Sequence, residues 1–220
     1  MRARTRSSTF LVREQKNETL ALSNAAKAGA AFFIGGVQFT LLWFLSETVY
    51  PNYSVANNYI SDLGTQCPTS GACYVPPAWW VFNSSEVIFG ILILIGVVFF
   101  FRAYPFRAVA VMLGIAGVGL IGVGVFNESF GLLHGLFSLV IFLFAGLSAI
   151  ITFRLQKPPL SYVSALLGVI SLIALILYIP GTGSFGNTMG IGPGGLERLI
   201  VYPVLVWTIG FGGHLMAVED

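Results

Sequence analysis

The chain has 220 residues, of which 56% are hydrophobic and only 9% are charged. A soluble domain of this length needs charges on about a quarter of its residues, so the composition excludes an ordinary water-soluble protein. The net charge is only +2, and the basic residues are scattered over short segments without interleaved aromatic residues, so we expect no nucleic-acid partner.

Six apolar segments are long enough to cross a bilayer, whose hydrocarbon core requires about 20 mostly apolar residues per helix. They cover residues 25–46, 84–104, 107–126, 131–153, 160–179 and 195–217. Residues 1–24 are rich in arginine and have no apolar signal-peptide core, so we expect a cytoplasmic tail. We therefore predict an all-α, polytopic membrane bundle of six transmembrane helices over residues 25–217. An extracytoplasmic cap loop would cover residues 47–83, and residues 218–220 would be a cytoplasmic C-terminus.

The positions of the basic residues predict the orientation, because lysine and arginine accumulate on the cytoplasmic side of membrane proteins. Every lysine and arginine except Arg198 lies before or at the start of the first segment, where the second segment ends and the third begins, or between the fourth and fifth. In a six-helix bundle these three places share one side. We therefore expect the protein to lie in the cell membrane with both termini in the cytoplasm. We call the opposite side of the membrane the outer side.

Both cysteines, Cys67 and Cys73, lie in the predicted cap loop. A close pair of cysteines outside the reducing cytosol is typical of a local disulfide. We therefore expect a disulfide bond between them that holds the shape of the loop.

Short motifs predict how the helices begin and how they pack. Asn83-Ser-Ser-Glu86 has the pattern of a capping box, so we expect it to begin the helix at 84–104. Five glycines lie at positions 114, 117, 119, 122 and 124, which is typical of a central helix that its neighbours approach closely. Gly131 and Gly135 predict another close contact on the fourth segment.

Polar residues that a loop does not require gather on the predicted outer side. They are Asn58, Ser61, Asp62, Asn127, Glu128, His134, Glu197, Arg198 and Tyr202. At 1.5 Å rise per residue, His134 lies within one or two helical turns of the outer surface. These nine residues are candidates for a shared ligand-binding pocket at the outer membrane boundary.

Arg198 is the only basic residue on this side, and an arginine at the hydrocarbon edge is costly unless it is paired or reaches water. Asp62, Glu128 and Glu197 are its candidate partners, and such a pair would tie the cap loop to the bundle. The alternative is a clamp for a phosphate or sulfate headgroup, assisted by the N-terminus of the last helix. The helix dipole accounts in part for Glu197 in the expected first turn.

His134 has a structural and a catalytic interpretation. With Asp62, Glu128 or Glu197 it could hold a divalent metal or act as a general base, so these four residues are the candidate catalytic and metal-binding residues. One histidine with scattered acids matches no recognised ligand spacing, and such a histidine more often hydrogen-bonds a neighbouring helix. We predict no cofactor, and His134 and His214 lie too far apart to ligate a single haem.

Transport receives little support, because the predicted helix midplanes lack ionisable residues. Gln38 is the clearest polar residue at mid-depth. Its amide is expected to bond another helix rather than to line a pore.

Four motifs resemble those of a known family. They are Asn58-Tyr-Ile-Ser-Asp-Leu-Gly64, Val81-Phe-Asn-Ser-Ser85, Asn127-Glu128 with His134-Gly135, and Glu197-Arg198 with Tyr202-Pro203 and Trp207. The chain resembles, over residues 25–217, an uncharacterised and largely archaeal family of six-helix integral membrane proteins, a domain of unknown function. The resemblance implies the family's fold, an outer polar cluster and an archaeal source. It implies no activity.

Two functions from different classes fit these observations. The first is a non-enzymatic module whose outer pocket binds a lipid headgroup, a small ligand or a partner protein. The alternative is a membrane-embedded hydrolase or transferase, with or without a metal, that acts on a lipid-linked substrate. In both cases the expected partners are membrane lipids and other membrane or envelope proteins.

Overall fold

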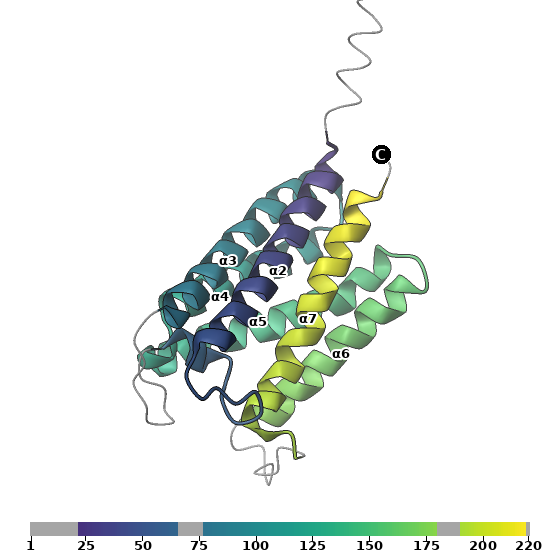
Figure 1. Cartoon of the computed structure of the whole chain (residues 1–220). Coiled ribbons are helices and arrows are strands. Elements are labelled where there is room, and N and C mark those ends of the chain that lie inside the picture. Colours follow the sequence, from purple (N-terminus) through teal and green to yellow (C-terminus); the bar gives the residue numbers. More distant parts are fainter. Residues whose placement is uncertain (1–21, 66–76, 180–189, 219–220) are drawn as a thin grey trace, which may run out of the picture.

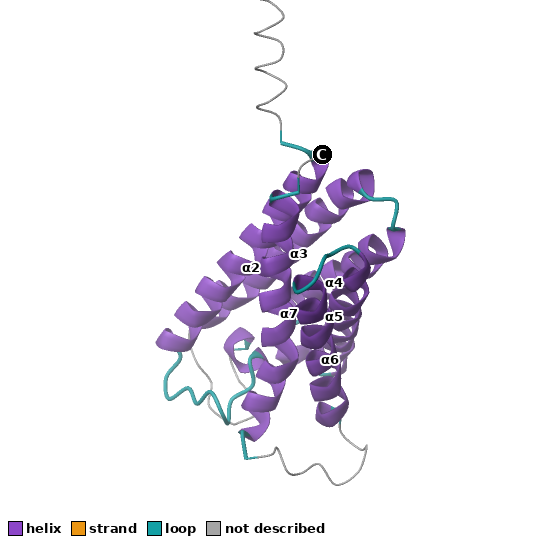
Figure 2. Ribbon diagram, turned by 90° about the vertical axis from the view of Figure 1, so that its right-hand side faces the viewer, coloured by secondary structure: helices purple, strands orange, loops and turns teal. Residues whose placement is uncertain are grey.

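The computed structural model describes residues 22–65, 77–179 and 190–218. Within these residues the chain is all-α and contains no strand (Figures 1 and 2), as predicted. The helices are α2 (Asn24–Val49), η1 (Ser61–Gly64), α3 (Ala78–Ala103), α4 (Arg107–Val125), η2 (Glu128–Phe130), α5 (Leu132–Ile151), η3 (Thr152–Arg154), α6 (Leu160–Tyr178) and α7 (Gly192–Met216), where η marks a short 3₁₀-helix. Cys67 and Cys73 lie outside the described residues.

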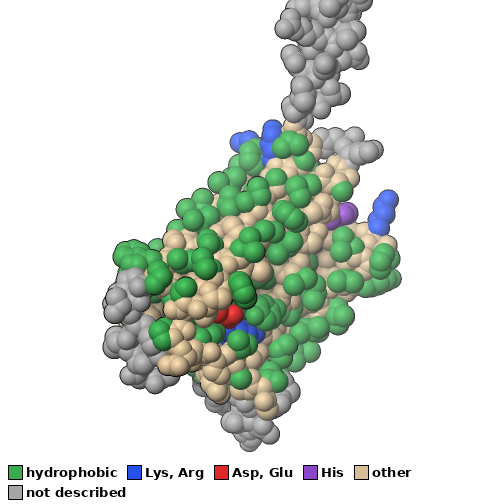
Figure 3. Space-filling model, in the orientation of Figure 1, with side chains coloured by type: hydrophobic (Ala, Val, Ile, Leu, Met, Phe, Trp, Pro, Cys, Tyr) green, Lys and Arg blue, Asp and Glu red, His purple; other side chains and the backbone are tan. Residues whose placement is uncertain are grey.

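All six α-helices are long and apolar enough to cross a bilayer. Each also exposes large apolar side chains on the surface of the bundle, for example Leu41, Ile95, Val118, Leu136, Ile173 and Val206. Figure 3 shows hydrophobic side chains over the length of the bundle, with most of the lysines and arginines toward one end. A soluble protein would bury such residues, so this chain is a multi-pass membrane protein.

The six helices form a closed ring in chain order. Each helix from α2 to α6 packs against the next, and α7 closes the ring against α2. The closing contact depends on two glycines, because a Cβ atom on Gly29 would lie only 2.5 Å from the carbonyl oxygen of Gly212. Helices α5 and α6 approach in the same way, since a Cβ atom on Gly168 would lie 2.6 Å from the carbonyl oxygen of Gly146. Small residues thus allow the helix backbones to come into close contact.

The two ends of the bundle differ in composition. We call one the cap end; it consists of residues 50–65, η2 and the N-terminal turns of α3, α5 and α7. We call the other the basic end; it carries Lys27, Arg102, Arg107, Arg154 and Lys157. Residues 22 and 218, where the described chain begins and stops, both lie at the basic end (Figure 1).

Helix α3 begins at Ala78 rather than at residue 84, so the predicted cap at Asn83–Glu86 is wrong. Trp79 to Phe82 continue the apolar pattern, and the helix extends through them. Inside the helix, the Asn83 side chain donates from Nδ2 to the carbonyl oxygen of Gly64 at 2.8 Å. The earlier start places Glu86 about 12 Å into the membrane-spanning helix, at 1.5 Å rise per residue.

Two expectations about glycines also need correction. Helix α4 is not central, because it lies in the ring between α3 and α5. Its glycines do permit close approach: a Cβ atom on Gly122 would lie 2.1 Å from the ring of Phe137. Gly131 and Gly135 make no such contact, since a Cβ atom on either would have nothing within 4 Å. The cap-end half of α5 is therefore packed less closely than predicted.

Candidate functional site

Arg198 organises the loop at the cap end. Its Nη1 donates to the carbonyl oxygens of Val55 (2.9 Å), Asn58 (3.1 Å) and Gly194 (2.9 Å). Its Nη2 donates to the Glu47 carboxylate at 2.8 Å and to the Tyr53 hydroxyl at 2.5 Å. We call Arg198, Glu47 and Tyr53 the arginine hub.

The hub ties the loop to α2 and α7. The expected pairing of Arg198 with Asp62, Glu128 or Glu197 is wrong, because its ion-pair partner is Glu47. Arg198 is only 3% exposed, and both terminal nitrogens donate to acceptors of the protein itself. Tyr53 extends the hydrogen-bond network, because its hydroxyl donates to the carbonyl oxygen of Tyr59 at 3.0 Å. Burial raises the pKa of the Tyr53 phenol above its usual range.

Asn58 and Asp62 fold the loop itself. The Asn58 amide donates to the Asp62 carboxylate at 2.8 Å, and the backbone N–H of Tyr59 donates to the same oxygen at 3.1 Å. The Asn58 oxygen accepts from the backbone N–H of Ser54 at 3.0 Å. Asp62 is 2% exposed, so its carboxylate is held inside a turn, as is common for asparagine and aspartate.

Asn127 and Tyr202 also have local structural contacts. The Asn127 side chain caps η2 by accepting from the backbone N–H of Ser129 at 3.1 Å. Tyr202 stacks on Trp43 with ring centroids 4.9 Å apart and remains 44% exposed. Neither residue lines the two cavities described next.

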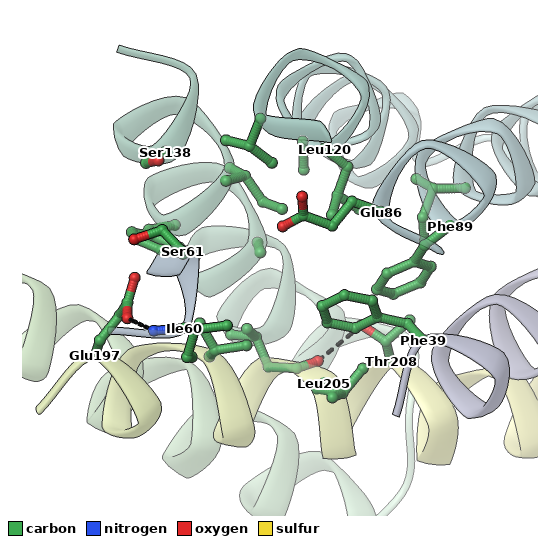
Figure 4. A pocket seen from close by; sticks show the side chains of 18 of the residues that line it. Phe39, Ile60, Ser61, Glu86, Phe89, Leu120, Ser138, Glu197, Leu205 and Thr208 are labelled. Atoms are coloured by element: carbon green, nitrogen blue, oxygen red, sulfur yellow. Dashed lines mark hydrogen bonds between the residues drawn. The ribbon is translucent and has the colours of Figure 1, made fainter. Parts of the chain in front are cut away.

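A central cavity of about 80 Å³ lies inside the ring of helices. Most of its wall is apolar and comes from α3, α4, α5 and α7, with residues such as Phe89, Ile93, Leu120 and Trp207. Glu86 and Glu197 are the acids in its wall. Figure 4 shows the Glu86 carboxylate extending into the pocket from one side, with Ser61, Ser138 and Glu197 on the other.

A side cavity of about 390 Å³ adjoins the central one and shares Ser61, His134, Ser138, Phe142 and Glu197 with it. Its remaining wall includes Tyr59, Glu128 and residues of α5 and α6. Several of those helix residues are exposed at the surface of the protein, among them Gly135 and Leu139. The side cavity therefore opens sideways between the cap-end halves of α5 and α6.

Helix α5 is packed unevenly, which explains the opening. Its only buried residues are Gly146, Ser148 and Ala149, all in the half toward the basic end. There Gly146 meets Gly168 of α6 at close distance. Toward the cap end the side cavity separates the two helices, with Leu139 on α5 and Leu175 on α6 in its wall.

His134 is oriented by the backbone. Its Nδ1 lies 2.8 Å from the carbonyl oxygen of Phe126. A carbonyl oxygen can only accept, so Nδ1 carries the proton, and in the neutral ring Nε2 is left with a free lone pair. Because His134 lines both cavities, Nε2 is available as a hydrogen-bond acceptor, a base or a metal ligand.

The two acids of the central cavity differ in their contacts. One oxygen of Glu197 accepts from the backbone N–H of Ile60, which fixes the side chain against η1 (Figure 4). Glu86 is 9% exposed, accepts no hydrogen bond and forms no ion pair with the described part of the chain. A buried carboxylate without a partner is unusual, because such groups are normally paired.

The acids and His134 do not form a ready metal site. Among the described residues, no three histidine, cysteine, aspartate or glutamate side chains are close enough to hold a metal ion. Asp62, one of the four metal candidates, lines neither cavity. His134 lies in the first turn of α5 at the cap end, whereas His214 lies in the last turn of α7 at the basic end.

The sequence model of a family described as "Protein of unknown function (DUF998)" matches residues 33–214. The chain belongs to the DUF998 family. The match extends from α2 to α7 and so includes every element that lines the two cavities of this DUF998 protein. No curated protein and no solved structure matches the chain.

Four of the nine ligand-binding candidates in this DUF998 protein share the side cavity: Ser61, Glu128, His134 and Glu197. The other five, Asn58, Asp62, Asn127, Arg198 and Tyr202, lie outside both cavities.

Glu86, Tyr59 and Tyr178 line the cavities but were not predicted. For Glu86 a signal exists, because it continues the buried stripe of Phe82, Phe89 and Ile93 at helical spacing. An acid on such a stripe faces the interior. The expected helix start at residue 84 concealed this pattern.

Proposed function

We propose that the central and side cavities together bind a small ligand or a lipid headgroup at the membrane boundary. The proposal rests on Glu86, whose carboxylate lines the central cavity without a partner in the described chain. Burying a carboxyl group without a hydrogen bond or an ion pair costs free energy in either protonation state, and no contact of Glu86 with the described residues offsets that cost. Contact with a molecule that enters the cavity accounts for the acid better than a contribution to folding does.

The other polar residues divide into two groups under this proposal. Ser61, Glu128, His134 and Glu197 would orient the ligand, because they line the side cavity. The arginine hub would hold the wall of the site. An anion clamp by Arg198 receives no support, because its terminal nitrogens already donate to the protein and it lines neither cavity.

We further propose that the protein lies in the cell membrane with its cap end outside and both termini in the cytoplasm. Support comes from the basic residues, because every lysine and arginine of the sequence except Arg198 is assigned to one side. A membrane-impermeant maleimide should label Ser54→Cys but not Lys157→Cys on intact cells, in a chain whose two native cysteines are replaced by serine. The reverse pattern would invert the proposed orientation.

Ligand retention tests the binding site. The wild-type protein and Glu86→Gln would be purified in a mild detergent and their bound molecules identified by native mass spectrometry. We expect a retained species whose occupancy falls about tenfold in Glu86→Gln, since a hydrogen bond to a charged group contributes about 1.5–3 kcal/mol. Ser84→Ala, on the exposed face of the same helix, is the control and should retain it. Equal retention by Glu86→Gln would contradict the proposal.

The geometry of His134 favours one second function, a hydrolase or transferase acting on a lipid-linked substrate. Its ring is fixed by the Phe126 carbonyl oxygen at Nδ1, and the residue lines both cavities together with Ser61 and Ser138. A neutral imidazole in this arrangement is suited to general-base catalysis. The opening between α5 and α6 would admit a substrate from the lipid.

His134→Asn separates this function from binding alone, because the asparagine amide can still donate to the Phe126 carbonyl oxygen while the equivalent of Nε2 is lost. Both proteins would be incubated in nanodiscs made from total polar lipids, and the lipids analysed by mass spectrometry. Consumption of one lipid class by the wild type but not by His134→Asn would support catalysis. Unchanged lipids with both proteins would leave binding as the function.

A further inference from the structure

The two cavities are lined by carboxyl groups and by hydrogen-bond acceptors. Glu86 and Glu197 line the central cavity, and Glu128 lines the side cavity together with Glu197. The free lone pair of His134 Nε2 adds another acceptor. Among the described residues, no lysine or arginine lines either cavity.

Within the described part of the chain, neither acid of the central cavity forms an ion pair with a basic side chain. Arg198 follows Glu197 directly in the sequence and its charge acts on Glu197, but its ion pair is with Glu47 and it lines neither cavity. Glu86 is nine-tenths buried, points into the central cavity (Figure 4) and has no partner among the residues that the structure describes. A cation entering the cavity would be its first partner.

The field at the mouth of the site is also negative. Tyr59 belongs to the loop that closes the side cavity. Burial raises the pKa of its phenol above the usual value, and the nearby charges of Glu197, Asp62 and Glu128 raise that pKa further. The same field would attract a cation and repel an anion.

The size and apolar walls of the cavities favour an organic cation. No three acidic, histidine or cysteine side chains among the described residues come together as a metal ion would require. An ammonium group with a hydrocarbon chain does not need three ligating side chains around it. The wall between α5 and α6 includes Leu139, Phe142, Leu175 and Ile179, which suit a hydrocarbon chain that continues into the lipid.

We propose that the ligand is a cationic amphiphile, whose ammonium group lies between Glu86 and Glu197 and whose hydrocarbon leaves between α5 and α6. This inference rests on the proposed binding function and specifies its ligand class. An amino lipid of the membrane and a free long-chain amine share this chemistry. Aromatic residues of the central cavity, including Phe39 and Phe89, can add cation–π attraction.

Three compounds of equal chain length test the charge of the ligand. Octylamine (a cation at pH 7), octanol and octanoate would be titrated into the purified full-length protein in neutral detergent, with the unfolding temperature as readout. We expect octylamine to bind about tenfold more tightly than the other two, since a charge-assisted hydrogen bond contributes about 1.5–3 kcal/mol. In Glu86→Gln the three compounds should become nearly equal. Glu197→Gln provides a second variant if Glu86→Gln fails to fold, and Ser84→Ala should behave as the wild type.

The outcomes of this titration test separately whether the ligand is a cation and whether the cavities bind a ligand at all. Equal binding of all three compounds to the wild type would overturn the cation assignment and leave the proposed site intact. A preference for octylamine that survives in both glutamine variants would also overturn it. No stabilisation by any of the three would overturn the inference and the binding function together.

A competition experiment distinguishes an amino lipid of the membrane from a free long-chain amine as the ligand. Protein in phosphatidylcholine nanodiscs, with or without phosphatidylethanolamine, would be titrated with octylamine. Weaker octylamine binding in the presence of phosphatidylethanolamine, whose headgroup carries a primary ammonium group, would support the ammonium group of a lipid as the ligand. Unchanged binding would support a free amine as the ligand.

Discussion

The cap end contains two groups of ionisable side chains that differ in what they contact. In the arginine hub, Arg198 donates to Glu47, Tyr53 and three backbone carbonyl oxygens. In the cavities, Glu86 has no partner among the described residues, and the one hydrogen bond that Glu197 accepts from them comes from the backbone N–H of Ile60. Glu197 and Arg198 are neighbours in the sequence, but successive helical residues point about 100° apart, so they serve different groups.

The difference indicates what each group is for. A buried charge whose partners all come from its own chain stabilises the arrangement of that chain. A buried charge without partners destabilises the fold, and such residues are typical of sites where stability is lost for the sake of binding or catalysis. The hub therefore belongs to the fold, and the cavities are where a ligand is expected.

Arg198→Met should have the largest effect on stability. The substitution leaves Glu47 without its ion-pair partner and removes the donor to Val55, Asn58 and Gly194. Breaking a buried pair from one side costs about 3–5 kcal/mol, so we expect a loss of that size in the free energy of unfolding. Unfolding by titration with a denaturing detergent, followed by circular dichroism, measures it.

A double-mutant cycle with Glu47→Gln shows whether the loss comes from the pair. In the double variant the two effects should be far from additive, because each single substitution already removes the same interaction. A loss below about 1 kcal/mol in Arg198→Met, the range of exposed ion pairs, would contradict the assigned role of the hub.

Glu86→Met should change stability in the opposite direction. Methionine is apolar and similar in length, and it removes a buried carboxyl group that has no partner in the described part of the chain. We expect the free energy of unfolding of the ligand-free protein to rise by about 1 kcal/mol, as is common when a functional residue is replaced by an apolar one. The same detergent titration measures the change, and a loss of more than about 1 kcal/mol would mean that Glu86 serves the fold.

The fold could be predicted from the sequence because lipid imposes simple requirements. A bilayer demands long apolar helices, and the six segments predicted from residues 25–217 correspond to the six membrane-spanning helices. The boundaries were less predictable. The residues Asn83 to Glu86 match the pattern of a helix cap, so the sequence predicts a helix start at residue 84. In the structure, Asn83 lies within α3.

The site could be predicted only in part, because a sequence shows which polar residues lie at one depth but not which way they point. Depth along the helices groups Ser61, Glu128, His134 and Glu197 together, and the structure brings these four residues to one cavity. The partner of Arg198 was missed, since Glu47 lies at the end of α2 and meets Arg198 only because the ring closes between α2 and α7. That closure depends on packing at Gly29 and Gly212, which no local motif reveals.

Gly135→Phe should have the smallest effect on stability and a clear effect on binding. A Cβ atom on Gly135 would have nothing within 4 Å, so the larger residue creates no clash. Phenylalanine is also the better helix former, and we expect the free energy of unfolding to stay within about 0.5 kcal/mol of the wild type. Gly135 lines the side cavity, however, so the ring would occupy the space between α5 and α6 assigned to the hydrocarbon. The stabilisation by octylamine should therefore fall to less than about half of the wild-type value, as mass action requires when affinity drops.

Gly210→Phe is the matched control for this substitution. Gly210 lies on α7, is exposed, has nothing within 4 Å of an added Cβ atom, and lines neither cavity. The Gly210→Phe substitution therefore adds the same ring to the lipid-facing surface without approaching the site. The stabilisation of this variant by octylamine should equal that of the wild type. If Gly135→Phe responded as strongly as this control, the hydrocarbon would not leave between α5 and α6. The loose packing of α5 at the cap end would then be a property of the fold alone, without a part in admitting a ligand.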